Sequence, residues 1–258
     1  MPGFVQMLLA AKSAITLGWL GLFLAAERLR PAAPPPPGPP WARLGRNGGL
    51  WLINGGLSVG FPVPLTAFAA AHGVWARLEW WGGGPGLLLD LALLEFWIYW
   101  WHRWNHEVGF LWRFHEVHHL DRFLDATSAL RFHVGEVALS ASARALVVMA
   151  LAVPLASVLV FETLLLATVF HHSNVRLPPG LERALARAII TPSIHWVHHH
   201  ARRSDTDANY GTVWSFWDRL FGTMSPTARS PDLVIGVEGE DERPLLGLLL
   251  RPFLPRPS

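Results

Sequence analysis

Cysteine is absent from this 258-residue chain, and charged residues make up only 16% of it. Without cysteine, the chain has no disulfide, no thiolate metal ligand and no cysteine nucleophile. It also lacks the G-x-G-x-x-G and phosphate-loop patterns of nucleotide-binding sites. Soluble domains contain about 25% charged residues, and the formal net charge here is only +2. The composition therefore argues against a cytosolic domain and against a nucleic-acid partner.

Apolar residues are abundant instead: 51% of the chain is hydrophobic, and it contains 14 tryptophans. Most of the apolar runs approach the roughly 20 residues that a membrane-spanning helix needs. They cover residues 4–26, 48–71, 86–101, 136–153 and 155–170. Pro62 and Pro64 predict a kink in the second run, and Pro154 separates the last two, which could also form a re-entrant hairpin. The pattern predicts an all-α integral membrane helical bundle.

The start of the chain allows two interpretations. A signal peptide would need positive charge before the apolar run, but residues 1–3 carry none and the run ends in a charged E-R-L-R segment. A spanning helix is therefore favoured. The proline-rich residues 31–40 predict a stiff extended loop rather than a docking site for a proline-binding domain. Arginines on both sides of this loop place it on the cytoplasmic side of the membrane.

Histidines form three groups with helical spacing, in which residues three and four apart share one face. The groups are His102 and His106; His115, His118 and His119; and His195, His198 and His199. An H-x-x-x-H pair offers two imidazoles to one point, and an H-x-x-H-H triplet offers three. Neutral imidazole binds Zn, Cu, Fe and Ni. A catalytic zinc takes about three protein ligands, so this number of histidines suggests two metal ions in one cage.

The predicted topology brings these groups to one membrane face. If the arginine-rich loop is cytoplasmic, the third apolar run delivers His102 to the cytoplasmic side. The hairpin around Pro154 then leaves and returns His172 to that side, where the third group follows. Glu95, inside the third run and seven residues before His102, shares its helix face. We expect Glu95 to hydrogen-bond a ligand histidine or to stabilise a polar seam.

Two other functions fit parts of the pattern. Residues 115–119 (HEVHH) also contain H-E-x-x-H, which on a helix is the site of a zinc metalloprotease with Glu116 as general base. A protease would not need the other two histidine groups. A metal transporter or storage protein is a third interpretation, but its metal-binding residues would line a path through the membrane instead of gathering at one face.

The order H-x-x-x-H, H-x-x-H-H, H-x-x-H-H, with a membrane hairpin before the last motif, resembles the fatty acid hydroxylase / sterol desaturase superfamily. The resemblance runs from about Asp90 to Thr223. It rests on WHRWNH (101–106), LWRFHEVHH (111–119), ATSALRFHVGE (126–136), FHHSNV (170–175), TPSIHWVHH (191–199) and NYG…WDRLFGT (209–223). The N-terminal runs and the C-terminal tail carry little of it.

The resemblance implies a non-haem di-iron centre that uses O₂ to hydroxylate or desaturate a lipid. The ligands it implies are the eight histidines of the three motifs and His172. His171 is a candidate for a further ligand, and His133 for a structural or supporting residue. Residues expected to orient the ligands are Glu95, Asp205, Asn209 and Asp218. Imidazole accepts zinc as well as iron, so the ligands alone do not identify the metal.

We therefore predict a helical bundle whose cytoplasmic-face helical cap carries a histidine-rich dimetal site. The predicted activity is O₂-dependent hydroxylation of a fatty acyl chain, a sterol or a related lipid, with desaturation as the alternative within the family. Electrons are expected from a separate donor, either a cytochrome b5-like protein, a ferredoxin with its reductase, or a pterin. Three regions are expected: N-terminal membrane helices (1–84), a catalytic domain (85–225) and a C-terminal tail (226–258).

Overall fold

The computed structural model describes residues 2–36 and 40–255, and every regular element in these residues is helical. Outside the helices, the described residues form three isolated β-bridges and no strand. The all-α prediction is therefore confirmed. The long helices are α1 (Pro2–Leu29), α2 (Trp41–Gly60), α3 (Pro62–Ala71), α4 (Gly83–Glu107), α5 (Gly109–His119), α6 (Val134–Ala150) and α7 (Leu155–Leu164).

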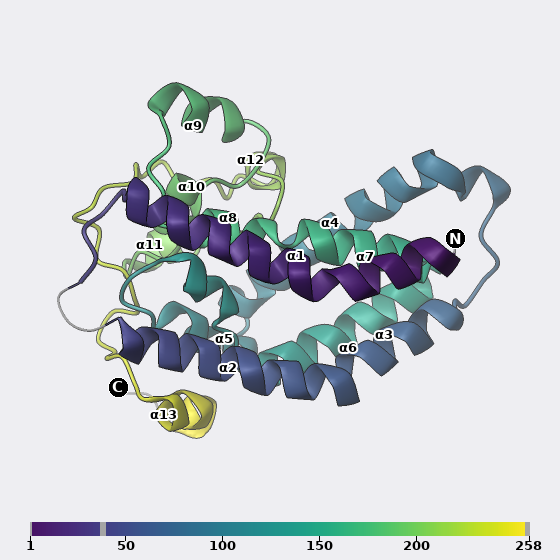
Figure 1. Ribbon diagram of the computed structural model, residues 1–258, viewed down its shortest axis with the longest axis horizontal. Helices are drawn as coiled ribbons and strands as arrows, with labels where there is room; N and C mark the ends of the chain where they lie inside the picture. Colours follow the sequence, from purple (N-terminus) through teal and green to yellow (C-terminus); the bar gives the residue numbers. More distant parts are fainter. Residues whose placement is uncertain (1, 37–39, 256–258) are drawn as a thin grey trace.

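Shorter helices complete the fold. They are η1 (Glu79–Trp81), η2 (Ala126–Leu130), α8 (Ala167–His172), α9 (Pro179–Leu185), α10 (Pro192–His198), α11 (Arg203–Thr206), α12 (Phe216–Leu220), α13 (Leu245–Leu250) and η3 (Arg251–Phe253). The helices form two layers: α1 packs along α7 in one, and α3 packs along α6 and next to α2 in the other (Figure 1). Helices α5, α8, α10 and α11 gather at one end of these layers (Figure 1).

Two helical stretches in the described part of the chain are long and apolar enough to cross a membrane. They are Trp41–Ala71, with 31 residues, and Leu155–His172, with 18 residues. The first is bent as predicted: Phe61, just before Pro62, leaves the helical region with φ −135° and ψ −71°. Helix α6 has only 17 residues, and Asp90 and Glu95 lower the hydropathy of α4, so neither meets the same criteria.

Buried polar contacts fix the N-terminal helices to the end of the molecule where the short helices gather. Arg43 of α2 donates to both carboxylate oxygens of Asp121, each at 2.9 Å. Burial opposes ionisation of Asp121, but Arg43 and Arg131 outweigh it and hold the pKa of this carboxyl well below its usual range. Glu27 of α1 accepts hydrogen bonds of 3.0 Å from the backbone N–H groups of Ala126 and Asn174. The arginine-rich loop and α5 therefore lie at the same end.

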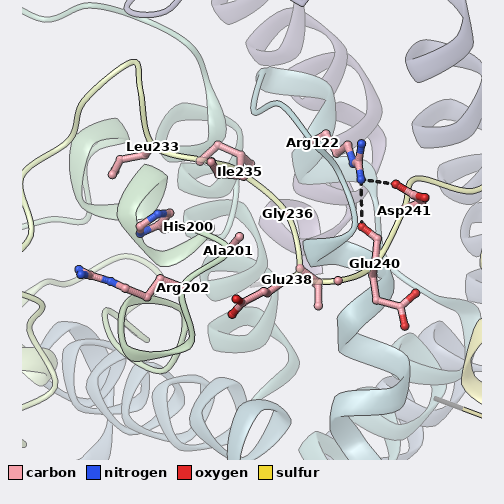
Figure 2. A pocket seen from close by; sticks show the side chains of 13 residues that line it. Arg122, His200, Ala201, Arg202, Leu233, Ile235, Gly236, Glu238, Glu240 and Asp241 are labelled. Carbon is pink, nitrogen blue, oxygen red and sulfur yellow. Dashed lines mark hydrogen bonds and ion pairs between the residues drawn. The ribbon is translucent and has the colours of Figure 1, made fainter. Parts of the chain in front are cut away.

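The C-terminal segment covers this end from outside. The N–H of Ala201 donates to the carbonyl of Val234 at 2.7 Å, and the N–H of Gly236 donates to the carbonyl of His199 at 3.1 Å. Figure 2 shows this segment beside His200, with Arg122 bonded to the Glu240 carbonyl and the Asp241 carboxylate. The residues drawn in Figure 2 line an open groove of about 900 Å³. The tail packs onto α10, although the predicted three-region division itself stays a prediction.

Candidate metal centre

Nine histidines from α4, α5, α8, α10 and the C-cap of α10 converge at this end of the molecule, and they divide into two groups. The five-histidine group contains His102, His106, His115, His119 and His198; the four-histidine group contains His118, His172, His195 and His199. Within each group, the nitrogen atoms that could bind a metal all lie within 4.8 Å of one another. All nine side chains are buried except His102, which is partly buried. The structure thus brings together all nine predicted ligands, while their binding of metal stays a prediction.

Each H-x-x-H-H motif is shared between the two groups. His115 and His119 belong to the five-histidine group, whereas His118 belongs to the other. In the second motif, His195 and His199 belong to the four-histidine group, whereas His198 belongs to the five-histidine group. The expectation that one motif offers three imidazoles to one point was therefore wrong. Relative to the first histidine of a motif, the residue four positions later is rotated by about 40° around the helix, and the residue three positions later by about 60° in the opposite direction. The side chains of these two later histidines therefore point toward different groups.

Backbone carbonyls orient four of the rings. The Nδ1 atoms of these rings donate to the carbonyl oxygens of Tyr210 (from His102, 2.8 Å), Arg131 (from His118, 3.1 Å), Thr168 (from His172, 2.7 Å) and Ala208 (from His198, 2.7 Å). A carbonyl oxygen can only accept a hydrogen bond, so each Nδ1 must carry the proton. In the neutral imidazole this leaves a lone pair on Nε2, which is the arrangement that a metal ligand requires.

Glu136 performs the same task for His115, and its role was not predicted. The Nδ1 atom of His115 lies 2.8 Å from Oε1 of Glu136, in the first turn of α6. Glu136 lies in the segment 126–136, which carries part of the family resemblance, but no function was predicted for it. The available sequence signal was a glutamate at the start of the apolar run 136–153, because a charge in such a run usually has a partner. A carboxylate behind a histidine ligand fixes its ring and raises its basicity.

The four-histidine group fits a bound cation. Nε2 of His118 and Nε2 of His172 lie 3.0 Å apart, although the Nδ1 protons of both rings are already donated to carbonyls. Neither Nε2 therefore has a proton for a hydrogen bond, and the two lone pairs repel. Two nitrogens that each lie about 2.0–2.1 Å from one metal ion are about 3 Å apart. The donors are all imidazoles, which suit iron and zinc alike.

The five-histidine group also has the donors that a cation would use. Nε2 atoms of His115 and His198 and both ring nitrogens of His106 and His119 are buried without a hydrogen-bond partner in the described residues. Unpaired buried polar atoms are costly and rare in native proteins. Burial, reinforced by the neighbouring rings, lowers the pKa of His119 well below its usual value, so this imidazole is neutral and able to bind a metal.

A cavity of about 560 Å³ leads from the helix bundle to both groups. It lies between the two layers, lined from one side by α3 and α6 and from the other by α4, α7 and α8. His102 and His115 of the five-histidine group and His118, His172 and His195 of the four-histidine group form its inner end. Apolar side chains such as Val63, Ile98, Val158 and Leu159 form much of its wall. An extended apolar molecule in this cavity would therefore reach the histidines.

Glu116 is engaged elsewhere. Its Oε2 atom lies 3.2 Å from Nη2 of Arg251, and the same guanidinium nitrogen lies 2.6 Å from Oε1 of Glu240. A general base in a metalloprotease must reach a metal-bound water, whereas this carboxylate is held by an ion pair to the C-terminal segment. The structure therefore gives no support to the metalloprotease interpretation.

The additional predicted site residues lie around the two groups. His171 belongs to neither, but its ring centroid is 4.0 Å from that of His195. His133 caps α6: its Nδ1 accepts from the Gly135 N–H at 2.9 Å, and its Nε2 donates to the Leu249 carbonyl at 3.0 Å. The geometry agrees with the structural alternative for His133.

The predicted orienting residues act on loops instead of on the rings. Asp218 accepts from the N–H groups of Tyr210 (2.7 Å) and Gly211 (2.9 Å), and so holds the loop whose carbonyl binds His102. Glu95 accepts from the Trp214 N–H at 3.2 Å in the same loop, and the described residues show no hydrogen bond from Glu95 to a ligand histidine. Of the two roles predicted for Glu95, stabilising a polar seam therefore fits the structure better than a hydrogen bond to a ligand histidine.

Asn209 and Asp205 connect the third motif to the segment that follows. Asn209 donates to the carbonyl of Ile194 at 3.2 Å and accepts from the Ser225 N–H at 2.9 Å; its left-handed φ of 57° is a conformation that asparagine tolerates. Asp205 accepts from Nδ1 of His200 at 2.7 Å and from the Ser225 hydroxyl at 2.9 Å. Asn209 thus bonds to α10 directly and Asp205 bonds to His200 just after it, and neither belongs to a histidine group.

Comparison with known proteins agrees with this geometry. The family model for fatty acid hydroxylase matches residues 87–223. The chain is 28% identical over 208 residues to the ornithine lipid hydroxylase of Rhizobium tropici, an alignment that covers 78% of this chain and 61% of the relative. It is 33% identical over 128 residues to the alkylglycerol monooxygenase of Danio rerio, covering 50% of this chain and 28% of the relative.

A cholesterol 25-hydroxylase-like protein of Danio rerio is 29% identical over 172 residues, covering 63% of this chain and 67% of the relative. The chain thus spans less than two thirds of the first two relatives. No solved structure matches the chain significantly.

Proposed function

We propose, because the chain belongs to the fatty acid hydroxylase family, that it is a membrane-bound oxidoreductase that hydroxylates a lipid with O₂ and two non-haem iron ions. The observation that supports this most directly is the pair of histidine groups at the inner end of an apolar cavity. The relatives named for hydroxylation or monooxygenation act on lipids by name, which favours hydroxylation over the desaturase alternative.

The five-histidine and four-histidine groups would each hold one iron ion. Iron bound there would supply the redox chemistry that activates O₂, which no side chain of this chain can supply. The protein's own residues bind and orient. Glu136 and the carbonyls of Tyr210, Arg131, Thr168 and Ala208 keep the ring protons on Nδ1, so that Nε2 of each ring remains free to bind a metal.

The cavity would bind the apolar part of the lipid and exclude water from the reacting carbon. Its walls come from α3, α4, α6 and α7, so a chain lying between the layers approaches both histidine groups from the membrane side. Excluding water favours oxidation of the lipid over side reactions at the metals. A lipid that enters from the bilayer needs no path through aqueous solution.

We also propose that the histidine centre faces the cytoplasm. Arginines precede and follow the proline-rich loop, and Arg43 after it bonds to Asp121, two residues beyond His119. The arginine-rich loop and the histidine centre thus share one end of the molecule, and basic residues favour the cytoplasmic side. Electrons would come from a separate cytoplasmic donor: a cytochrome b5-like protein, a ferredoxin with its reductase, or a pterin.

Lipid mass spectrometry of cells that express the chain tests this function, with the His118→Ala variant as the matched inactive control. We expect a lipid species that gains one oxygen atom only with the unaltered protein. A species that loses two hydrogen atoms instead would establish the desaturase alternative. The proposal would be contradicted if the cell lipids were unchanged and if the purified protein, fully loaded with metal and supplied with electrons, also oxidised no lipid.

A further inference from the structure

The cavity contains one ion pair away from the histidine centre. Nη2 of Arg144 on α6 lies 2.8 Å from Oε1 of Glu162 on α7, and both residues line the cavity. Apart from Glu136, which bonds to His115, these are the only ionisable residues besides histidine that line it within the described chain. Their side chains are 15% and 21% exposed. Two opposite charges therefore face an otherwise largely apolar space.

The position of this pair along the cavity is set by the helices that carry it. Arg144 follows Glu136 by eight residues on α6, which corresponds to about 12 Å of helix. Glu162 precedes His172 by ten residues in the stretch Leu155–His172, which corresponds to about 15 Å. Both measures place the pair well inside the bundle, at a fixed distance from the two histidine groups.

A purely structural role does not account for this location. Charges within membrane helices are costly, and they usually face a bundle interior or a cavity where they have a function. A tie between α6 and α7 could be made by packed apolar residues, because replacing a buried ion pair by such residues is often neutral or stabilising. Nε of Arg144 is in addition buried without a hydrogen-bond partner in the described residues. Arg144 thus keeps an unpaired donor beside the cavity that its side chain lines.

We propose that Arg144 and Glu162 bind an uncharged polar group of the lipid substrate, a hydroxyl or an amide, and thereby select which carbon reaches the histidine centre. This inference rests on the proposed lipid hydroxylase function. The guanidinium donates to an oxygen atom, and the carboxylate accepts from an O–H or N–H. A hydroxyl or an amide satisfies both at once.

The substrate class that follows is a lipid with a hydroxyl or amide at a fixed distance from the oxidised carbon. A site that hydrogen-bonds a substrate group discriminates strongly against an analogue without it, because its own polar atoms are then left unpaired. The fixed spacing also predicts one main product. An apolar chain without such a group could slide along the cavity and would be oxidised at several neighbouring carbons.

Competition among three probes of equal chain length tests the proposal with purified, metal-loaded protein in detergent, supplied with O₂ and with electrons from a ferredoxin and its reductase. The probes are 1-hexadecanol, hexadecanamide and hexadecane, and mass spectrometry reads both the relative kcat/KM and the position of oxidation. We expect the alcohol or the amide to be preferred over hexadecane by about tenfold or more, with a single main product. Comparison of the alcohol with the amide identifies which of the two groups the pair takes.

The double variant Arg144→Met/Glu162→Leu removes the ion pair while keeping apolar volume. We expect it to retain metal content and thermal stability, because apolar replacements of buried pairs are tolerated, but to lose the preference and to give several products. A Ser140→Ala variant, altered on the same cavity wall, serves as the control and should keep the preference. If the double variant keeps both preference and product position, the inference is overturned.

Two further outcomes separate this inference from the function on which it rests. If the unaltered protein oxidises all three probes equally and at many positions, Arg144 and Glu162 do not select the substrate, but the lipid hydroxylase function stands. If it oxidises neither these probes nor membrane lipids, the proposed function fails and the inference with it.

Discussion

The two histidine groups differ in how the chain builds them. Four members of the five-histidine group, His102 to His119, come from the consecutive helices α4 and α5, and only His198 is distant in sequence. The four-histidine group takes its members from α5, α8, α10 and the C-cap of α10, and these four histidines are spread over residues 118–199. The first group is therefore largely fixed by local helix geometry. The second exists only when helices far apart in sequence are packed together.

Removing one histidine from each group should produce the largest effects and expose this difference. We expect His118→Ala and His119→Ala each to lower lipid oxidation by at least about a hundredfold, because a metal ligand is lost. His118→Ala leaves three histidines in its group, whereas His119→Ala leaves four. Elemental analysis should therefore find a larger loss of bound metal in His118→Ala.

A variant that keeps full lipid oxidation would remove that residue from the metal site. Equal loss of metal in the two variants would show that the groups do not bind metal independently, and would contradict the comparison.

Glu136→Gln should produce the next largest effect, which is a weaker binding of metal by the five-histidine group. The amide could no longer act as a charged acceptor for His115, and loss of such an outer partner typically lowers metal affinity or activity by 10- to 100-fold. Metal titration with a competing chelator measures the affinity. The matched control is Glu95→Gln, which alters an equally buried carboxylate that bonds to Trp214 instead of a histidine. A similar loss of affinity in both variants would refute the specific role of Glu136.

Glu116→Gln should affect stability more than chemistry. Its carboxylate pairs with Arg251, which keeps a second partner in Glu240. We expect a loss of about 1–3 kcal/mol in the free energy of unfolding, with lipid oxidation per bound metal essentially unchanged. Thermal unfolding and a turnover assay corrected for metal content measure the two quantities. Complete loss of activity in fully metal-loaded protein would instead favour a catalytic role for Glu116.

His133→Ala should have the smallest effect of these five changes. His133 caps α6 and contacts the Leu249 carbonyl, and it belongs to neither histidine group. Loss of a helix cap costs about 1 kcal/mol, so the unfolding temperature should fall slightly while the metal content stays the same. A measured drop in metal content would place His133 closer to the site than its hydrogen bonds indicate.

Helical spacing and composition predict much of this arrangement. The three motifs identify eight of the nine clustered histidines, and Pro62 predicts the bend at Phe61. The sharing of each H-x-x-H-H motif between the groups was not predicted, because spacing gives the rotation around one helix and not the position of the neighbouring helices. The carbonyls of Tyr210, Arg131 and Ala208 could not be predicted either, since a backbone acceptor leaves no trace in residue identity.

Arg43 and Glu27 carry a consequence for how the protein is made. N-terminal segments are synthesised and fold first, so α1 and α2 are made before residues 121–174 leave the ribosome. Until then, the guanidinium of Arg43 and the carboxylate of Glu27 lack the partners that they have in the finished protein, Asp121 and the amides of Ala126 and Asn174. The packing of α1 and α2 is therefore completed only when the histidine-bearing segment has been synthesised and supplies these hydrogen-bond partners.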